Sequence, residues 1–192
     1  DGLPVVHDGE VNALLTALRS HLGEDKPVAI AGRVDSIEAI HRMTNDQAID
    51  AVFIRLATPA GISAPATLPR IGLSARDSGA AESGLTQVLT MPWRTAGSDI
   101  AISVAAGCGL VCANPFADAE NVPSSQKAVA AAVEEWLTDV AAELRGCMAE
   151  LGLDSLEALN RRHLRALDHD TASQSGLRLA GYDRPLPEWL GQ

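Results

Sequence analysis

Residues 26–56, which read KPVAIAGRVDSIEAIHRMTNDQAIDAVFIRL, decide the fold class of this 192-residue chain. The apolar run at 28–31 ends at Gly32 and predicts a short buried strand. Residues 36–43 begin with a serine that suits a helix N-cap and place isoleucines at helical spacing, which predicts a helix. Residues 50–56 predict a second strand. Strand, helix and strand within about 30 residues form a βαβ unit, so we expect parallel strands joined by a right-handed crossover.

Amphipathic helices are predicted on both sides of this unit. Residues 11–22 place their leucines on one helical face and are followed by the helix-stopping Gly23. Apolar residues recur every three or four positions over 124–151, which predicts a long helix that Gly152 ends. A capping-box-like start predicts a further helix over 154–167.

The middle of the chain gives weaker signals. Residues 58–69 contain three prolines and a glycine and predict a loop. Residues 70–74 predict a short strand, and 84–91 a weak helix. Residues 99–111 are apolar and rich in small side chains, and their periodicity fits a strand or a helix equally. The polar, then proline-containing tail beyond residue 168 predicts an arm that lies on the surface.

These elements together predict an α/β fold with two parts. A partial (β/α)-barrel-like parallel sheet occupies residues 1–120, and a C-terminal helical extension with a tail occupies 121–192. A closed (β/α)8 barrel takes about 250 residues, and only three or four candidate strands are present. Because such a sheet leaves edges and an apolar face uncovered, we expect it to pair through 28–56 with another polypeptide chain or with a copy of itself. A small closed sheet, and hence a monomer, is the alternative.

The composition excludes several classes of function. A net charge of −10 with no basic stripe argues against nucleic-acid binding and against anionic membrane surfaces. No apolar run reaches the ~18 residues that a membrane span needs, and the first residues lack the pattern of a signal peptide. Three cysteines are too few for a secreted disulfide framework. We therefore expect a cytoplasmic protein.

Three stretches, in order, resemble the end of the flavin domain of glutamate-synthase-like proteins. Residues 26–36 with the following helix and strand are similar to a strand, a glycine turn over the flavin phosphate, and the next helix and strand of that family. Residues 105–112, AAGCGLVC, are similar to its glycine-cysteine stretch that opens an iron–sulfur ligand set. Residues 142–159, AELRGCMAELGLDSLEAL, are similar to its C-terminal helical segment. Residues 165–168 and 175–181 also resemble tails of this family.

The resemblance implies an FMN-dependent oxidoreductase barrel. In the intact family, ammonia from glutamine combines with 2-oxoglutarate, and reduced flavin delivers hydride to the 2-iminoglutarate. The implied cofactor-binding residues are those at the ends of the two strands: Gly32, Arg33, Val34, Arg55, Ala57 and Thr58. Backbone N–H groups where a strand meets a helix can hold a phosphate, and an arginine can add a charge-assisted hydrogen bond. Alternatively, Gly32 is an ordinary turn glycine and Arg33 a surface cation.

The sequence also departs from the family pattern. The family's cluster uses three cysteines, the last followed by proline, whereas Asn114 precedes the proline here. Cys108 and Cys112 are the candidate metal ligands, but iron–sulfur clusters need three or four thiolates. Cys147 lies within the predicted long helix, where a small buried side chain suits it better. We expect no iron–sulfur cluster in this chain alone, and free thiols at a lost cluster site are the alternative to metal binding.

The histidines are further candidate functional groups, and two other functions are open to the chain. His7 with Asp8 could form an acid–base pair and His41 could reach a phosphate turn, but a structural or surface role fits all five histidines. No catalytic residue is predicted. Besides part of a flavin enzyme, the chain could be a non-catalytic assembly subunit that has lost its flavin site, or a small cysteine-based redox or metal module.

Overall fold

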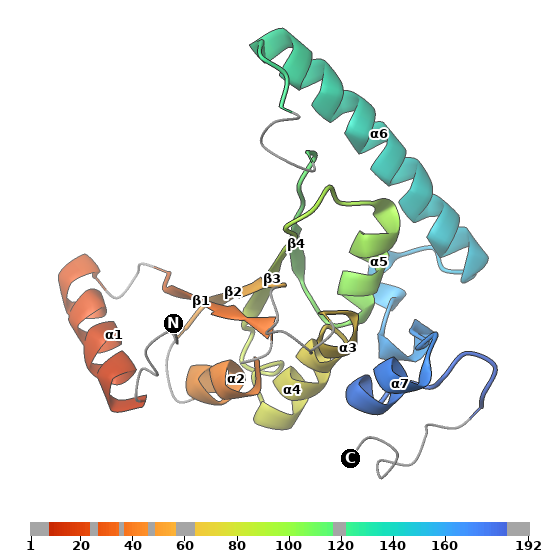
Figure 1. The fold of residues 1–192 in the computed structure, drawn as a ribbon. Helices are drawn as coiled ribbons and strands as arrows, with labels where there is room; N and C mark the ends of the chain where they lie inside the picture. Colours follow the sequence, from red (N-terminus) through yellow and green to blue (C-terminus); the bar gives the residue numbers. More distant parts are fainter. Residues whose placement is uncertain are drawn as a thin grey trace.

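Helices and strands alternate along the chain in a computed structural model, which describes residues 8–23, 27–34, 37–45, 49–56, 64–116 and 122–183. Figure 1 shows a central sheet with helices beneath it and one long helix that extends away from it. The strands are β1 (Ala29–Arg33), β2 (Ala51–Arg55), β3 (Thr86–Thr90) and β4 (Leu110–Cys112). The longer helices are α1 (Asp8–Leu22), α2 (Ile37–Asn45), α4 (Arg70–Ser78), α5 (Gly97–Ala105) and α6 (Gln126–Glu150).

The sheet is entirely parallel, and its order β1-β2-β3-β4 follows the chain. Helices α2, α4 and α5 each connect one strand to the next. Because parallel crossovers are right-handed and the order never reverses, the three connecting helices fall on the same face of the sheet. This arrangement confirms the predicted α/β class, with a partial barrel-like parallel sheet and a C-terminal helix, and the predicted β1-α2-β2 unit.

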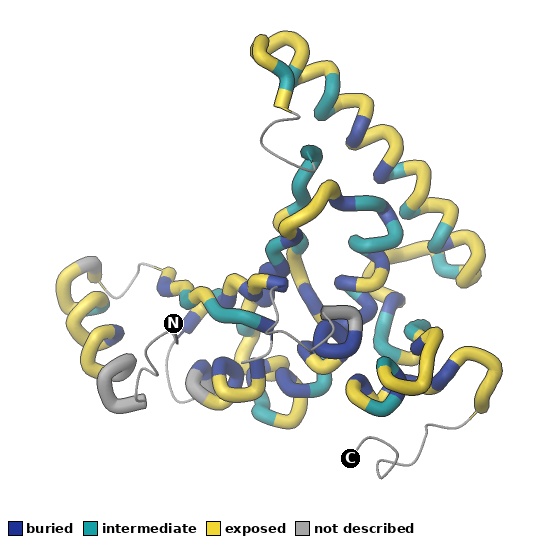
Figure 2. Tube along the Cα trace, viewed as in Figure 1, coloured by how far each residue is buried: buried dark blue, intermediate teal, exposed yellow. Residues whose placement is uncertain are grey.

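One face of the sheet is packed against these helices. Val52 and Ile54 of β2 and Leu89 of β3 have no exposed surface, and they form one cluster with residues of α2 and α4. Gly32 in β1 faces the same way, since a Cβ there would lie 2.1 Å from Cδ1 of Ile40 on α2. The alternating dark and light segments of the strands are visible in Figure 2. A larger residue at position 32 would therefore require the end of the Ile40 side chain to move.

The other face is left open by the described helices. The strand register places Ala31, Phe53, Val88 and Leu110 side by side across all four strands. Ala31 is exposed, Phe53 is 43% exposed and Leu110 is 55% exposed, while Val88 is shielded between the last two. Because side chains alternate along a strand, this apolar row points away from the helix-covered core.

Two predicted elements in the middle of the chain are wrong in type. Residues 70–74, predicted as a strand, belong to helix α4, whose buried residues Ile71, Ser74 and Ala75 lie at helical spacing. Residues 84–91, predicted as a weak helix, contain strand β3. In both elements a polar residue occupies a buried position: Ser74 in α4 and Gln87 in β3. Each one interrupts the spacing of apolar residues from which the type of element was predicted.

The structure resolves the ambiguous stretch at 99–111, which contributes to both helix α5 and strand β4. The predicted loop at 58–69 contains the short helix α3 (Ala64–Thr67), and its first residues lie outside the described ranges.

The C-terminal part is less regular than predicted. Helix α6 confirms the predicted long helix. The helix predicted over 154–167 is wrong, since the chain forms two short 3-10 turns, η3 (Leu156–Ala158) and η4 (Arg161–His163). Side chains of Ser155 and Asn160 cap these turns. Asn160 has an extended backbone and caps the second turn, so it separates the two turns. The leucines of 156–167 therefore do not belong to one continuous helix.

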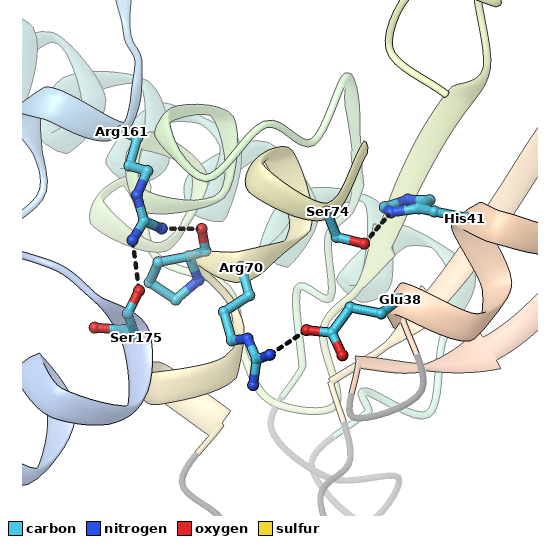
Figure 3. A network of polar contacts seen from close by, with 7 residues as sticks. Glu38, His41, Arg70, Ser74, Arg161 and Ser175 are labelled. Atoms are coloured by element: carbon cyan, nitrogen blue, oxygen red, sulfur yellow. Dashed lines mark hydrogen bonds and ion pairs between the residues drawn. The ribbon is translucent and has the colours of Figure 1, made fainter. Parts of the chain in front are cut away.

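The predicted surface arm instead contains helix α7 (His169–Ser175), which packs against α3. Arg161 fixes this part to the body by donating hydrogen bonds to the backbone carbonyl oxygens of Pro69 and Ser175 (Figure 3). Leu164 packs against both the sheet core and the α5–α6 cluster. The C-terminal region thus shares its core with the sheet region. Within the described ranges, no helix has the length and apolar character that crossing a membrane requires.

Candidate functional site

The carboxyl ends of the four strands form a second row on the open face. Register pairs Arg33 with Arg55, Arg55 with Thr90, and Thr90 with Cys112. This row lies two residues beyond the apolar row on each strand, and therefore on the same face. Ligands of parallel α/β sheets bind at the carboxyl ends of the strands. The row of Arg33, Arg55 and Thr90 is therefore the candidate site.

The structure brings together only part of the predicted cofactor set. Arg33 and Arg55 are register partners on neighbouring strands, and Arg55 is exposed. Gly32 is the penultimate residue of β1 and faces α2, and the side chain of Val34 is buried in the core. Only the backbone of these two residues could contact a ligand. Ala57 and Thr58 lie outside the described residues.

The two arginines give the site its electrostatic character. Two guanidinium groups on adjacent strands form a locally positive edge on a chain of net charge −10. Guanidinium groups bind phosphate and carboxylate through charge-assisted hydrogen bonds. Thr90 completes the row, and its hydroxyl donates to the carbonyl oxygen of Ile54 at 3.3 Å. The two guanidinium groups are donors whose charge fits an anion.

A second feature at this edge, which the sequence interpretation missed, is the amino-terminal end of α5. The N–H groups of Gly97 and Ser98 donate to the Glu143 carboxylate of α6 at 2.9 and 3.3 Å. The Ala96 N–H donates to Asp99 at 2.9 Å. Hydrogen bonds from Ser98 and Gly97 lower the pKa of Glu143. This helix end, which would otherwise suit a phosphate, is therefore occupied by the protein's own carboxylates.

The contact between α5 and α6 is unusually close at the same point. A Cβ on Gly97 would lie 2.5 Å from the backbone nitrogen of Leu144 and 2.6 Å from the carbonyl oxygen of Val140. Trp136 of α6 donates its indole N–H to the carbonyl oxygen of Thr95 at 2.8 Å. No sequence pattern marks this contact, because Gly97 and its partner helix are far apart in the chain.

The loops after β3 and β4 are held together beside the site. The N–H of Thr95 donates to the carbonyl oxygen of Asn114, and the N–H of Asn114 donates to the hydroxyl of Thr95, both at 2.8 Å. An apolar cavity of about 450 Å³ lies next to these loops. Its lining includes Leu56, Met91, Trp93, Ile102, Leu164 and Leu177. Leu56 and Met91 directly follow β2 and β3, so the cavity adjoins the carboxyl edge.

The three cysteines lie in three different environments. Cys108 is buried in the helix-covered core, where burial raises its pKa to about 12. Cys112 is exposed on the open face, and Cys147 of α6 is half-buried against the cluster that α5 and α6 form. Within the described part of the chain, no three His, Cys, Asp or Glu side chains gather as a metal-binding group would require. Cys108 is held as a protonated thiol at neutral pH, which makes it a poor metal ligand.

His41 belongs to a buried network away from the carboxyl edge. Its Nδ1 lies 2.9 Å from the Ser74 hydroxyl and its Nε2 lies 2.9 Å from Oε1 of Gln87. Gln87 in turn donates to the carbonyl oxygen of Gly107 at 3.2 Å. Burial lowers the pKa of His41. The network joins α2, α4 and β3, as Figure 3 shows for His41 and Ser74, and supports a structural role.

The other predicted acid–base pair is not defined by the structure. Asp8 is the first residue of α1, and His7 lies outside the described residues. The candidate site thus consists of Arg33, Arg55 and Thr90. The apolar row lies on the same face, two residues earlier on each strand.

The sequence matches no family model, and no curated protein matches it.

Proposed function

We propose that this chain is the flavin-phosphate-binding part of an FMN-dependent oxidoreductase barrel of the glutamate-synthase type. The observation that carries the proposal is the register pairing of Arg33 with Arg55 at the carboxyl ends of adjacent parallel strands. Both arginines lie on the face that the described helices leave open. Active sites of (β/α)8 enzymes lie at this end of the strands, inside the ring that this face would line.

The residues of the open face suit the parts of FMN. Arg33 and Arg55 would hold the phosphate by charge-assisted hydrogen bonds. The apolar row of Ala31, Phe53, Val88 and Leu110 offers an apolar surface for a flat ring. FMN, when bound, would supply the hydride for reduction of an imine. This chain contributes binding and exclusion of water, and no catalytic residue is assigned to it.

The proposal includes a partner. Four strands supply half the number in an eight-stranded barrel. Strands β1 and β4 are edges of this sheet, and the open face exposes Phe53 and Leu110. Another polypeptide or a second copy that continues the sheet from an edge strand would complete the ring around the open face. Association through the sheet is therefore part of the proposed function.

The experiment compares FMN with riboflavin, which has the same ring system but no phosphate. The full chain is titrated into each flavin and the quenching of flavin fluorescence is followed. We expect FMN to bind more tightly than riboflavin. Arg33→Gln and Arg55→Gln should each weaken FMN binding about tenfold, because each removes a charge-assisted hydrogen bond, and should leave riboflavin unchanged. Arg42→Gln on α2 is the matched control, because Arg42 is exposed and lies on a helix of the covered side.

Two outcomes would overturn the phosphate assignment. The first is equal affinity for FMN and riboflavin. The second is FMN binding that Arg33→Gln and Arg55→Gln leave unchanged, or that Arg42→Gln weakens as much as they do.

A second candidate function is a non-catalytic assembly subunit. The observation that favours it is the occupation of the α5 amino-terminal end by Glu143 and Asp99, together with the separation of the three cysteines. Such a chain would be purified colourless, bound to its partner, and would fail to bind either flavin. Flavin titration of the purified complex distinguishes the two candidates.

A further inference from the structure

The apolar cavity beside the carboxyl edge lies where the C-terminal region meets the sheet and helix α5. Its volume of about 450 Å³ is within the range of pockets that hold small organic molecules. Its walls come from the residues that follow β2 and β3, from α5, and from the chain between η4 and residue 177. Arg33, Arg55 and Thr90, which form the proposed flavin-phosphate site, do not line it.

The floor of this cavity is a junction between two packed clusters. Leu56, Leu68 and Met91 belong to the core of the sheet, whereas Ala166 and Leu177 belong to the cluster of the C-terminal region. All five residues line the cavity. Protein interiors are close-packed, and voids larger than a water molecule are few. An apolar cavity of this size between packed clusters is therefore typical of a ligand site.

Three large apolar side chains that line the cavity are also exposed to solvent. Trp93 is 38% exposed, Ile102 is 42% exposed and Leu167 is 86% exposed. They come from the loop after β3, from α5, and from the residue before the α7 N-cap. The indole N–H of Trp93 donates to Asp99 at 3.1 Å, which fixes the ring before any ligand binds. Exposed apolar side chains that gather at one cavity mark a binding site.

The charged groups of the lining decide which ligand the cavity favours. They are Asp99, Arg165 and Asp168. Arg165 donates to two nearby backbone carbonyl oxygens, at 2.6 and 2.8 Å. Hydrogen bonds from the backbone N–H and the hydroxyl of Thr171 lower the pKa of Asp168, so its carboxylate is charged at neutral pH. Two carboxylates against one guanidinium favour a cation over an anion.

We propose that this cavity binds a small organic cation, an amine attached to an apolar ring or chain. The apolar part fills the space between the two clusters. The ammonium group lies toward Asp99, Asp168 and the ring of Trp93, whose face attracts a cation. Each carboxylate can accept about four hydrogen bonds, so both keep their present partners. The net charge of −10 also attracts cations to the protein surface.

The test uses three probes that share one ring system and differ in charge: 1-naphthylmethylamine, 1-naphthylmethanol and 1-naphthylacetate. Isothermal titration calorimetry measures the affinity of the full chain for each at neutral pH. The amine should bind about tenfold more tightly than the alcohol, because the alcohol lacks the charge that the carboxylates and the indole ring attract. The acetate should bind most weakly. No binding of the amine at millimolar concentration, or equal affinities for the amine and the alcohol, would overturn the proposal.

Two conservative variants remove the charges but keep the hydrogen-bond acceptors. Asp99→Asn and Asp168→Asn should each weaken binding of the amine about threefold and leave the alcohol unchanged, because asparagine caps a helix as aspartate does. Leu167→Ala tests the apolar part of the site at a position so exposed that the fold does not depend on it. It should weaken binding of both the amine and the alcohol about threefold.

A matched control separates the cavity from a general effect of charge. Asp139→Asn changes the net charge by the same amount as Asp168→Asn, at an exposed position on α6 that does not line the cavity. It should leave the affinity for the amine unchanged. Far-UV circular dichroism of each variant checks that the helix content is kept. A loss of affinity in Asp139→Asn as large as in Asp168→Asn, or affinities that Leu167→Ala leaves unchanged, would contradict binding in this cavity.

Discussion

The two faces of the same sheet differ sharply. On strand β2, Ile54 points to the helices and has no exposed surface, whereas its neighbour Phe53 points the other way and is 43% exposed. Strands of parallel sheets are normally buried on both faces. The helix-covered face is therefore a packed core, whereas the described helices leave the other face exposed at Phe53 and Leu110. The difference separates residues that hold the fold from residues available for a ligand or partner.

Charge and polarity support this distinction. On the covered face, the buried His41 is hydrogen-bonded to both Ser74 and Gln87. The open face instead carries an apolar row and, at its carboxyl edge, two arginines in register. A buried polar network stabilises one fold when every member is satisfied. A pair of arginines, one exposed and one half-buried, next to apolar side chains suits recognition of an amphipathic anion.

The largest expected difference between the faces is in thiol reactivity. Cys108 lies in the covered core, is 2% exposed and has its pKa raised to about 12, whereas Cys112 is exposed on the open face. Because the thiolate is the reactive form, we expect Cys112 to be modified at least about a thousandfold faster than Cys108 in the folded protein. Modification by a disulfide reagent with peptide mapping measures both rates, and Cys147→Ser removes the third thiol. Equal rates would mean that the two cysteines do not differ in environment.

Truncation of two neighbouring side chains should show the next largest effect. Ile54→Ala should lower the free energy of unfolding by about 3–4 kcal/mol, because it leaves a cavity in a packed core. Phe53→Ala removes a larger side chain but should cost less than about 1 kcal/mol, since Phe53 is already partly in water. Urea unfolding of dilute protein measures both. A loss of 3 kcal/mol or more for Phe53→Ala would show that the open face is covered in the isolated chain.

The predicted parts of the fold are those where the hydrophobic pattern is simple. The β1-α2-β2 unit and α6 were predicted because apolar residues mark most of their buried sides, although α2 also buries His41 and Thr44. Helix α4 and strand β3 were assigned to the wrong class because Ser74 and Gln87 occupy buried positions and bond to His41. A hydrogen-bonded polar residue in the core breaks the pattern that sequence analysis reads. Its partners are distant in sequence, so the pairing could not be seen.

A smaller effect is expected in the pH dependence of the free energy of unfolding, because His41 is buried on the covered face. Burial lowers the pKa of His41 against the raising effects of its hydrogen bond to Gln87 and the charge of Glu38. The folded state therefore binds the proton less readily than the unfolded chain, and stability falls as pH drops below about 6.5. Unfolding by urea between pH 7.5 and pH 5 measures this slope.

Two variants identify the group responsible. His41→Gln should flatten the slope while lowering stability at pH 7.5 by roughly 1–3 kcal/mol, because its partners lose hydrogen bonds. Ser74→Ala removes one partner but keeps the imidazole, and should keep the slope. A wild-type slope in His41→Gln would exclude His41 as its source.

The candidate site was predicted in part, for a topological reason. Arg33 and Arg55 could be placed together because parallel strands end at the same edge. The roles of Gly32 and Val34 could not be read from the sequence, since their contacts with α2 and the core depend on packing. Glu143 was missed because it reaches α5 from a helix that begins 29 residues after Gly97. Contacts of this kind follow from helix crossing and leave no local sequence signal.

Hydrogen exchange with and without FMN tests the central claim most directly. If the carboxyl edge of the open face binds the flavin phosphate, FMN should slow amide exchange at the ends of β1, β2 and β3, around Arg33, Arg55 and Thr90. Riboflavin should give less protection at Arg33 and Arg55. Helix α6 should be unaffected by either flavin. Protection confined to α6 or to the amino-terminal end of α5, or no protection at saturating FMN, would contradict the account.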